Sequence, residues 1–297
     1  CEVVAGGEEE LRRHPFMTLY AEPISPLQHA EDAAQKLMLA GKKQLPVVYT
    51  PCIMAGGTVP ATLAGAMANG LAESLSGLVL NQLTNEGSPF IMGGVFTIMD
   101  MNTTIFSYGA PEFDLMMSAL ADVSNYLDLP MFGTAGCTDS KVVDEQACIE
   151  DALSILMTAQ SGANLNHDVG YIEHGNAASL ENLVINNDII GFARRIVQGI
   201  EVNEDTLAVD LIDKVGPGGH FLGEEHTMKY FKKETYYPDL FKRQFFENWQ
   251  EEGSKTLFDR ANDKVIDILE NYEPEPLPKD VQQKLQDIVD RAESKLD

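Results

Sequence analysis

The stretch PMFGTAGCTDSK, Pro130 to Lys141, begins as a short apolar run and ends in small, polar and reactive residues. The apolar half is typical of a buried strand, and a helical pattern starts close behind it, at about Val142. A strand, a polar loop and a helix in this order form one unit of a parallel α/β fold. Active sites of such folds are built at the carboxyl ends of the strands. The second half of the stretch is therefore expected to face a functional site.

The same unit recurs along the chain. Apolar runs predict further strands at Phe16–Tyr20, at Val47–Tyr49, in PFIMGGVF (89–96) and at about Ala163–Val169. Helices are predicted from Ser25 and Pro26 to Gly41, in ATLAGAMANGLAESLSGLVLNQL (61–83), from Pro111 through EFDLMMSALADVSNYL, at about 143–159 and in LENLVINNDIIGFARRIVQGI (180–200). Strands spaced about 30 to 45 residues apart, with helices between them, indicate parallel neighbours, because parallel strands need a crossover.

Five such units can form an open sheet or part of a closed barrel. No GxGxxG follows the first strand, which disfavours a nucleotide-binding open sheet. We therefore predict an α/β fold of the (β/α)8 TIM barrel type, with about five βα units within residues 1–200. About three strands would be missing on the N-terminal side, and we expect residues to precede Cys1. Such a fragment would expose two unpaired strand edges.

Residues 201–297 are predicted to form a helical C-terminal extension packed on the barrel. The amphipathic segments are VNEDTLAVDLIDKVG, which ends at Gly216, FLGEEHTMKYF, SKTLFDRANDKVIDILENY and VQQKLQDIVDRAESKL. In the last of them Val281, Leu285, Ile288, Val289 and Ala292 share one helical face.

Composition excludes several classes of function. A formal net charge of −25 argues against a nucleic-acid partner, because such binding needs a basic face. No window approaches 18 continuous apolar residues and no secretory signal is visible, so we expect no membrane partner. Four scattered cysteines do not make a disulfide framework, which favours the cytoplasm.

The strand-end rule selects residues that would converge on one face. They are Glu22, Thr50, Cys52, Phe96, Thr134, Cys137, Asp139, Lys141, His167, Asp168, Tyr171, Glu173 and His174. Cys52 and Cys148 are interpreted as structural, whereas Cys137 lies in a loop. Lys141 is expected to pair with Asp139. No HExxH or similar spacing supports a metal site, so none is predicted.

The glycine-rich segment GPGGHFLGEEHT (216–227) has two readings. It is either a turn between helices that needs positive φ, or a loop that carries His220, Phe221 and His226 over a barrel mouth.

With these loops in view, the sequence resembles the trimethylamine methyltransferase family of corrinoid-protein methyltransferases. The resemblance rests on RRHPFMTLYAEPISPLQ, AGGTVPATLAG, GLVLNQL, CTDSKVVDEQA, SLENLVINNDIIGFARRIVQGI and VNEDTLAVDLIDKVGPGGHFL, which together run through the whole chain. It implies a (β/α)8 barrel, and also that this chain is roughly the C-terminal three-fifths of a member.

One departure from the family matters. Members that act on trimethylamine carry pyrrolysine just ahead of a Ser-Asp-Ala-Lys-like stretch, where TAGCTDSK holds Cys137. Members without pyrrolysine look like demethylases of quaternary amines such as glycine betaine. The resemblance thus implies transfer of a methyl group to the Co(I) of a corrinoid (cobalamin) carried by a cognate corrinoid protein, with no cofactor bound directly. It also implies a place in methylamine metabolism and methanogenesis, and we expect a homo-oligomer.

A trimethylammonium group is a soft cation that aromatic faces hold well. Rings expected to contact it are Tyr20, Phe96, Tyr108, Tyr171 and Phe221, with Tyr49 and Phe132 as further candidates. The expected catalytic residues are Glu173, which adds charge complementarity, and Cys137. Predicted substrate-binding histidines are His167, His174, His220 and His226, the last three as partners for a substrate carboxylate.

Two alternatives stay open. A Schiff-base aldolase or lyase would use Lys141, although a nearby carboxylate opposes the lowered lysine pKa that this chemistry requires. A non-catalytic paralogue would bind a betaine or a corrinoid protein without transferring a methyl group.

Overall fold

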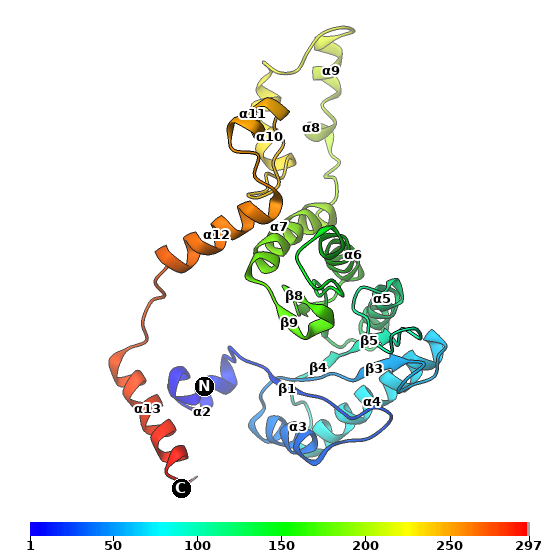
Figure 1. The fold of residues 1–297 in the computed structure, drawn as a ribbon, viewed down its shortest axis with the longest axis vertical. Coiled ribbons are helices and arrows are strands. Elements are labelled where there is room, and N and C mark those ends of the chain that lie inside the picture. The colour runs from blue at the N-terminus through cyan, green and yellow to red at the C-terminus, as the bar shows by residue number, and fades with distance from the viewer. Residues whose placement is uncertain (296–297) are drawn as a thin grey trace.

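The computed structural model describes residues 1–295. Its centre is a curled sheet of five parallel strands, β1 (Leu19–Ala21), β2 (Val47–Tyr49), β4 (Phe90–Gly93), β6 (Met131–Thr134) and β7 (Leu165–His167), in the order β1-β2-β4-β6-β7. Each strand follows its neighbour through a helical crossover, as parallel pairing requires. The sheet and its helices form a partial (β/α)8 barrel, which confirms the predicted fold class (Figure 1).

Five long helices cover the outer face of this sheet (Figure 1). They are α3 (Glu31–Lys43), α4 (Leu63–Thr84), α5 (Pro111–Tyr126), α6 (Glu145–Ser161) and α7 (Leu180–Val197). The buried core lies between the strands and these helices, in one cluster under α3, α4 and α5 and a second between α6 and α7. Pro111 begins α5 at its first position, as predicted.

Two strands continue past the sheet on the carboxyl side. β3 (Cys52–Ala55) follows β2, β5 (Val95–Ile98) follows β4, and the two pair in parallel. The register is unbroken, since Tyr49 pairs with Met92 and Cys52 pairs with Val95. The barrel wall is therefore extended on this side, directly beside the strand ends.

Glycines in α4 explain how this helix approaches the sheet. A Cβ atom at Gly70 would collide with the ring of Phe96, and one at Gly77 would collide with the ring of Tyr49. Both rings are fully buried. The glycines are seven residues apart and so share one helical face. The Ala- and Gly-rich composition of this segment thus serves close packing over two large aromatic side chains.

Within residues 1–295, α4 is the one helix long and apolar enough to cross a membrane by length and composition. The sequence scan did not find it, because Glu73 interrupts the apolar run. Glu73 is buried at 1% exposure and lies where α4 packs on the barrel. Its carboxylate accepts hydrogen bonds from the Ser25 hydroxyl (2.7 Å), the Leu27 amide (2.8 Å) and the Asn69 side chain (2.8 Å). These contacts identify α4 as a helix of the barrel layer.

Two local predictions are corrected by the structure. Ser25 and Pro26 do not begin a helix: they form a tight loop closed by the Ile24–Gln28 bridge and held by Glu73, and α3 starts later. The helix expected after Val202 is broken into α8 (Glu204–Leu207) and α9 (Val209–Val215), because Ala208 has a left-handed φ of 50°. α9 ends at Gly216, as predicted.

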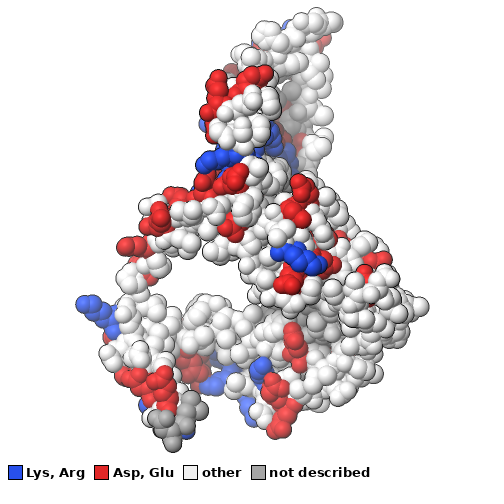
Figure 2. Space-filling view, viewed as in Figure 1, with Lys and Arg blue, Asp and Glu red and all other residues white. Residues whose placement is uncertain are grey.

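The remaining helices lie outside this layer of barrel helices. They are α1 (Glu2–Ala5), α2 (Glu8–Arg13), α10 (Glu225–Glu234), α11 (Phe246–Glu251), α12 (Leu257–Asn271) and α13 (Lys279–Glu293). The segment from α8 to α11 projects away from the barrel as an arm (Figure 1). α12 returns to pack on α7, and α13 lies beside α1. Acidic side chains are prominent on α12 and α13 (Figure 2).

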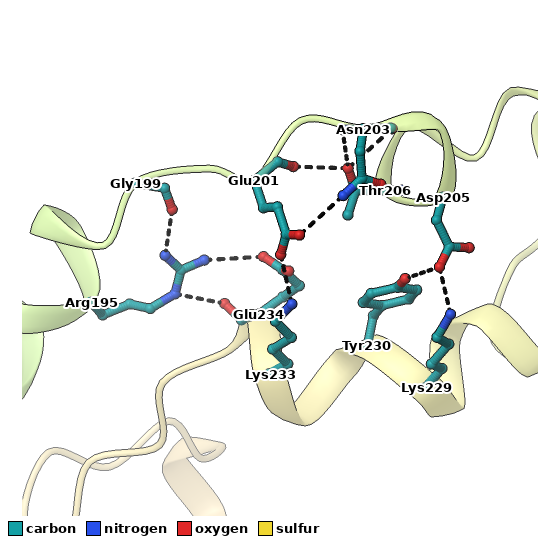
Figure 3. Close-up of polar contacts among 10 residues, drawn as sticks. All are labelled: Arg195, Gly199, Glu201, Asn203, Asp205, Thr206, Lys229, Tyr230, Lys233 and Glu234. Atoms are coloured by element: carbon teal, nitrogen blue, oxygen red, sulfur yellow. Dashed lines mark hydrogen bonds and ion pairs between the residues drawn. The ribbon is translucent and has the colours of Figure 1, made fainter.

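The arm is held by a network of exposed polar contacts (Figure 3). Asp205 pairs with Lys229 (2.5 Å) and accepts a hydrogen bond from the Tyr230 hydroxyl. Lys233 pairs with Glu201 (2.6 Å), and Arg195 pairs with Glu234 (3.2 Å). The extension packs on the barrel through α12 and through the 236–241 segment, where Leu240 and Phe241 pack with the cluster of α6 and α7.

Candidate functional site

A cavity of about 370 Å³ lies at the carboxyl ends of the strands. Its ten lining residues are Tyr20, Glu22, Cys52, Val95, Tyr108, Phe132, His167, Asp168, Tyr171 and Gly175. They come from or follow β1, β2, β4, β6 and β7, so the curl of the sheet brings residues from both of its edges to one place. This is the face on which the strand-end rule placed the site.

One wall of the cavity is a group of stacked rings. The Phe132 and His167 rings stack with centroids 4.4 Å apart and an angle of 18° between their planes. The edge of Tyr20 meets both, at centroid distances of 6.1 and 6.2 Å. These three residues belong to β6, β7 and β1, and their packing closes the ring wall across the two edges of the sheet.

His167 is held on both ring nitrogens. Its Nδ1 lies 2.7 Å from Asp168 Oδ1, and its Nε2 lies 2.8 Å from Thr134 Oγ1. A carboxylate can only accept, so in the neutral imidazole Nδ1–H donates to Asp168 and Nε2 accepts from the buried Thr134 hydroxyl. Asp168 has a left-handed φ of 71°, which turns the chain directly after β7. The Asp168 carboxylate thus fixes the ring that stacks on Phe132.

Tyr20 and Glu22 form a second ring–carboxylate pair. The Tyr20 hydroxyl donates to Glu22 Oε1 at 2.6 Å. Partial burial and this hydrogen bond both raise the pKa of Tyr20, so the phenol stays protonated and remains a donor. Glu22 itself is exposed and lies at the cavity rim.

Tyr108 is positioned through its main chain. Asp139 Oδ1 accepts a hydrogen bond from the Tyr108 amide (2.8 Å), and its other oxygen accepts from the Ser107 hydroxyl. Glu150 in turn accepts from the Asp139 amide (2.8 Å) and from the Thr138 hydroxyl. Burial and the charge of Asp168 raise the pKa of the Tyr108 hydroxyl. The expected Lys141–Asp139 ion pair is absent among the described residues, because the carboxylate is occupied by the 107–108 segment.

The loop after β7 docks on the loop after β6. Cys137 forms a bridge with Tyr171, and the amides of Glu173 and His174 donate to the carbonyls of Ser140 (2.7 Å) and Thr138 (3.0 Å). Glu173, His174 and Gly175 all have positive φ, of 53°, 47° and 87°. Two of these are non-glycine residues, so the turn is strained. It places Gly175 against the Tyr108 ring, where a Cβ atom would lie 3.4 Å from Cε2.

Glu173 and Cys137, the residues expected to be catalytic, do not line the cavity. Cys137 is 2% exposed, and burial raises the pKa of its thiol, with smaller contributions from Asp168 and Asp151. Burial likewise raises the pKa of Cys52, which does line the cavity, to about 12. Both sulfurs are therefore neutral thiols at physiological pH and poor nucleophiles.

The other predicted residues divide between the cavity and elsewhere. Tyr20, Tyr108, His167 and Tyr171 line it. Phe96 is fully buried beneath Gly70 and belongs to the core. His174 stands next to Gly175 but bonds to Asn176 (2.9 Å).

The glycine-rich loop is not brought to the cavity. His226 lies 3.1 Å from the Asp205 carbonyl and packs on Tyr230 within the arm, and His220 and Phe221 are exposed there. Lys141 is also exposed, and its Nζ donates to the Asp139 carbonyl at 2.8 Å. That environment lacks the desolvation that a Schiff-base lysine requires. Among residues 1–295, no group of three His, Cys, Asp or Glu side chains is arranged to hold a metal ion.

Sequence reasoning missed the buried polar support behind the site. Ser154 accepts from the Gly136 amide (3.1 Å), and the Asn186 side chain donates to the Gly136 carbonyl (3.2 Å). Asn182 donates to Asp151 (2.9 Å), and burial raises the pKa of Asp151 to about 6. Polar residues on the inner faces of two predicted helices, in the letters IEDALS and ENLVINN, are the signal that could have revealed this support.

Comparison with known proteins places these features in context. The profile of the trimethylamine methyltransferase (MTTB) family matches residues 1–297. A trimethylamine methyltransferase of Desulfitobacterium hafniense is 36% identical over 98% of this chain and 58% of its own length. One of Methanosarcina acetivorans is 36% identical over 97% of this chain and 58% of its own length. A glycine betaine methyltransferase of D. hafniense is 33% identical over 97% of this chain and 60% of its own length. The chain therefore spans about three-fifths of the length of these relatives.

Proposed function

Because the chain belongs to the trimethylamine methyltransferase (MTTB) family, we propose that it is part of a methyltransferase that moves a methyl group from a quaternary amine to the Co(I) of a partner corrinoid protein. Relatives named for trimethylamine and for glycine betaine both match it, which supports methylated amines as the substrate class. The resemblance implies that Cys137 stands where members acting on trimethylamine carry pyrrolysine, and without pyrrolysine we propose a quaternary rather than a tertiary amine as the substrate.

The observation that carries the proposal is the make-up of the cavity. Four aromatic side chains, the His167 ring and two carboxylates surround a space of about 370 Å³. A methylated ammonium group has no N–H to donate, so ring faces and nearby negative charge are the protein groups that bind it best. Each desolvated ring face contributes about 0.5–2 kcal/mol.

The corrinoid supplies a strong nucleophile, the electron pair of Co(I), which forms the new bond to carbon. On the substrate side the C–N bond breaks and its electron pair stays on nitrogen, which leaves as a neutral tertiary amine. No proton has to move. The work of Tyr20, Phe132, Tyr108 and Tyr171 is then to hold the cation in one orientation with a methyl group presented toward the rim.

The four rings Tyr20, Tyr108, Phe132 and Tyr171, together with Glu22 and Asp168, are here called the cage. The cage stabilises the charged substrate more than the transition state, in which positive charge on nitrogen is already falling. It therefore contributes binding and orientation, and it favours release of the neutral product. Tight cation binding alone would not raise the rate of transfer.

The position of the cavity suits a cofactor that arrives on another protein. Tyr20 is 39% exposed and Tyr171 is 41% exposed, so the ring wall is reachable from outside. The raised pKa of Cys52 has a protective consequence here. A thiolate beside a quaternary ammonium could be methylated itself, and keeping the sulfur protonated suppresses this competing reaction.

The test uses the full-length protein that contains this chain, Co(I)-cobalamin and, in separate reactions, glycine betaine, proline betaine, carnitine, choline, tetramethylammonium and trimethylamine. Appearance of methylcobalamin absorbance with at least one quaternary amine is expected. Turnover of trimethylamine without any quaternary amine would contradict the proposal.

Partner and location belong to the same proposal. We expect a cognate corrinoid protein as the methyl acceptor, a homo-oligomeric enzyme and a cytoplasmic location. Exposed apolar side chains along the arm, such as Val209, Ile212 and Leu222, support association with other protein surfaces.

A further inference from the structure

Two fixed carboxylates face the cavity from opposite edges of the sheet. Glu22 follows β1 and Asp168 follows β7, the two edge strands. Both line the cavity, and the charge of both raises the pKa of the Cys52 thiol between them. A ligand in this space therefore lies in the negative field of both groups at once.

Among residues 1–295, no lysine or arginine forms an ion pair with either carboxylate. Glu22 accepts from the Tyr20 phenol and Asp168 from the His167 imidazole, so each is oriented by a ring that lines the cavity. Within residues 1–295, none of the ten lining residues is a lysine or arginine. Lys141, the basic residue of the loop after β6, bonds to a main-chain carbonyl and does not line the cavity.

From this arrangement we infer that the cavity selects methylammonium cations that carry no carboxylate of their own, such as tetramethylammonium or choline. The inference rests on the proposed function and narrows its substrate class. In glycine betaine the carboxylate is one carbon from the nitrogen. Seating the trimethylammonium group in the cage would bring that carboxylate into the field of Glu22 and Asp168, where like charges repel.

The closest test compares glycine betaine with glycine betaine amide, which keeps the trimethylammonium group and loses the negative charge. Calorimetry on the full-length protein at pH 7.5 should show the amide, choline and tetramethylammonium binding at least about tenfold more tightly than glycine betaine. The neutral carbon analogue of choline, 3,3-dimethylbutan-1-ol, should bind more weakly than choline. Glycine betaine binding as tightly as its amide would overturn the inference.

Glu22→Gln provides the matched variant, because it removes the charge and keeps an acceptor for the Tyr20 hydroxyl. It should weaken choline binding about five- to twentyfold and reduce the preference for the amide over glycine betaine. Glu86→Gln changes an exposed carboxylate just beyond the C-terminal end of α4, makes the same change in net charge and should alter neither. Asp168→Asn is less suitable, since Asp168 also sets the His167 tautomer. An unchanged preference in Glu22→Gln would contradict the inference.

The same measurements separate this inference from the proposed function. Selective cation binding without methyl transfer to Co(I) would support the inference and remove the proposed reaction. Methyl transfer from glycine betaine in preference to choline would support the reaction and overturn the inference. Failure of every quaternary cation to bind would overturn both.

Discussion

The cavity and the arm contain the same pair of groups in different electrostatic settings. In the arm the Tyr230 hydroxyl donates to Asp205, which also pairs with Lys229 at 2.5 Å (Figure 3). At the cavity the Tyr20 hydroxyl donates to Glu22, and no lysine joins the pair among the lining residues. The first carboxylate is neutralised within the chain, whereas the second keeps its charge for a ligand. A tyrosine–carboxylate pair thus indicates a cation-binding site only when no lysine or arginine of the chain is paired with the carboxylate.

The two regions also differ in how carboxylates are satisfied. Barrel carboxylates such as Glu73 and Asp188 are buried and accept from neutral amides and hydroxyls. Arm carboxylates are exposed and pair with lysine or arginine. Buried hydrogen bonds are costly to break, because removing one partner leaves the others unpaired, whereas exposed ion pairs contribute little. Removing a carboxylate should therefore lower the free energy of unfolding much more in the barrel than in the arm.

The largest loss of stability is expected when Glu73 is replaced. Glu73→Ala would leave the Ser25 hydroxyl, the Leu27 amide and the Asn69 side chain without their acceptor inside the barrel layer. We expect a loss of about 2–4 kcal/mol in the free energy of unfolding, measured by urea denaturation. Glu201→Ala in the arm is the comparison, and an equally large loss there would refute the distinction between the regions.

The pH dependence of stability should have opposite signs in the two regions. Burial raises the pKa of Asp151 to about 6, with a smaller contribution from the charge of Glu150. The folded protein then binds the proton more tightly than the unfolded chain does. The contribution of Asp151 to the free energy of unfolding therefore falls as pH rises and is lowest above about pH 6. A shift of about two units corresponds to about 3 kcal/mol lost between pH 4 and pH 6.

Asp151→Asn should remove that penalty. The unfolding free energy of this variant, relative to that of the native protein, should increase as pH rises from 4 to 7 and stay constant above pH 7. Asp205 behaves oppositely, because its hydrogen bonds and ion pair with Lys229 and Tyr230 lower its pKa. Asp205→Asn should lose stability relative to the native protein as pH rises through that lowered pKa. Parallel pH profiles for the two variants would contradict this prediction.

The sequence was informative where the structure follows local rules. The runs at Val47 and Met131 are apolar, short and flanked by turn residues, and both form strands with the predicted positions. The first strand was placed too early, because Phe16 is 57% exposed and pairing begins only at Leu19. Apolar composition indicates that a strand exists, but hydrogen-bonding partners decide where it begins.

The cavity was harder to predict because side chains alternate across a strand. Val95 lines the cavity, whereas Phe96, the residue predicted to contact the ligand, is buried in the core on the other face of the strand. The space that Gly70 provides for Phe96 was the available clue. The placement of His220 and His226 depended on a long arm whose direction no local pattern encodes.

A cage ring should matter for binding in a way that an arm ring does not. Phe132→Leu keeps apolar bulk but removes the face that stacks on His167. We expect tetramethylammonium affinity to fall about five- to twentyfold, as loss of one cation–π contact and its support implies. Tyr230→Phe keeps its ring but loses the bond to Asp205, and it should leave the affinity unchanged. If Phe132→Leu and the native protein bound tetramethylammonium with equal affinity, Phe132 would not contribute to cation binding.

The smallest effect should come from the arm lysine that distinguishes the two tyrosine–carboxylate pairs. Lys229→Met keeps the length of the side chain and removes the charge opposite Asp205. Both groups are exposed and screened by solvent, so the urea midpoint at 0.15 M salt should shift by no more than the experimental error. The informative measurement is then made on ligand binding. With its lysine gone, Asp205 beside Tyr230 becomes a carboxylate–ring pair like that of Glu22 and Tyr20, yet it lacks the surrounding rings of the cavity. If Lys229→Met acquires no affinity for tetramethylammonium, an uncompensated carboxylate is insufficient and the enclosing aromatic wall is required as well. If it does acquire affinity, charge alone accounts for cation binding and the stacked wall at the strand ends loses its assigned role.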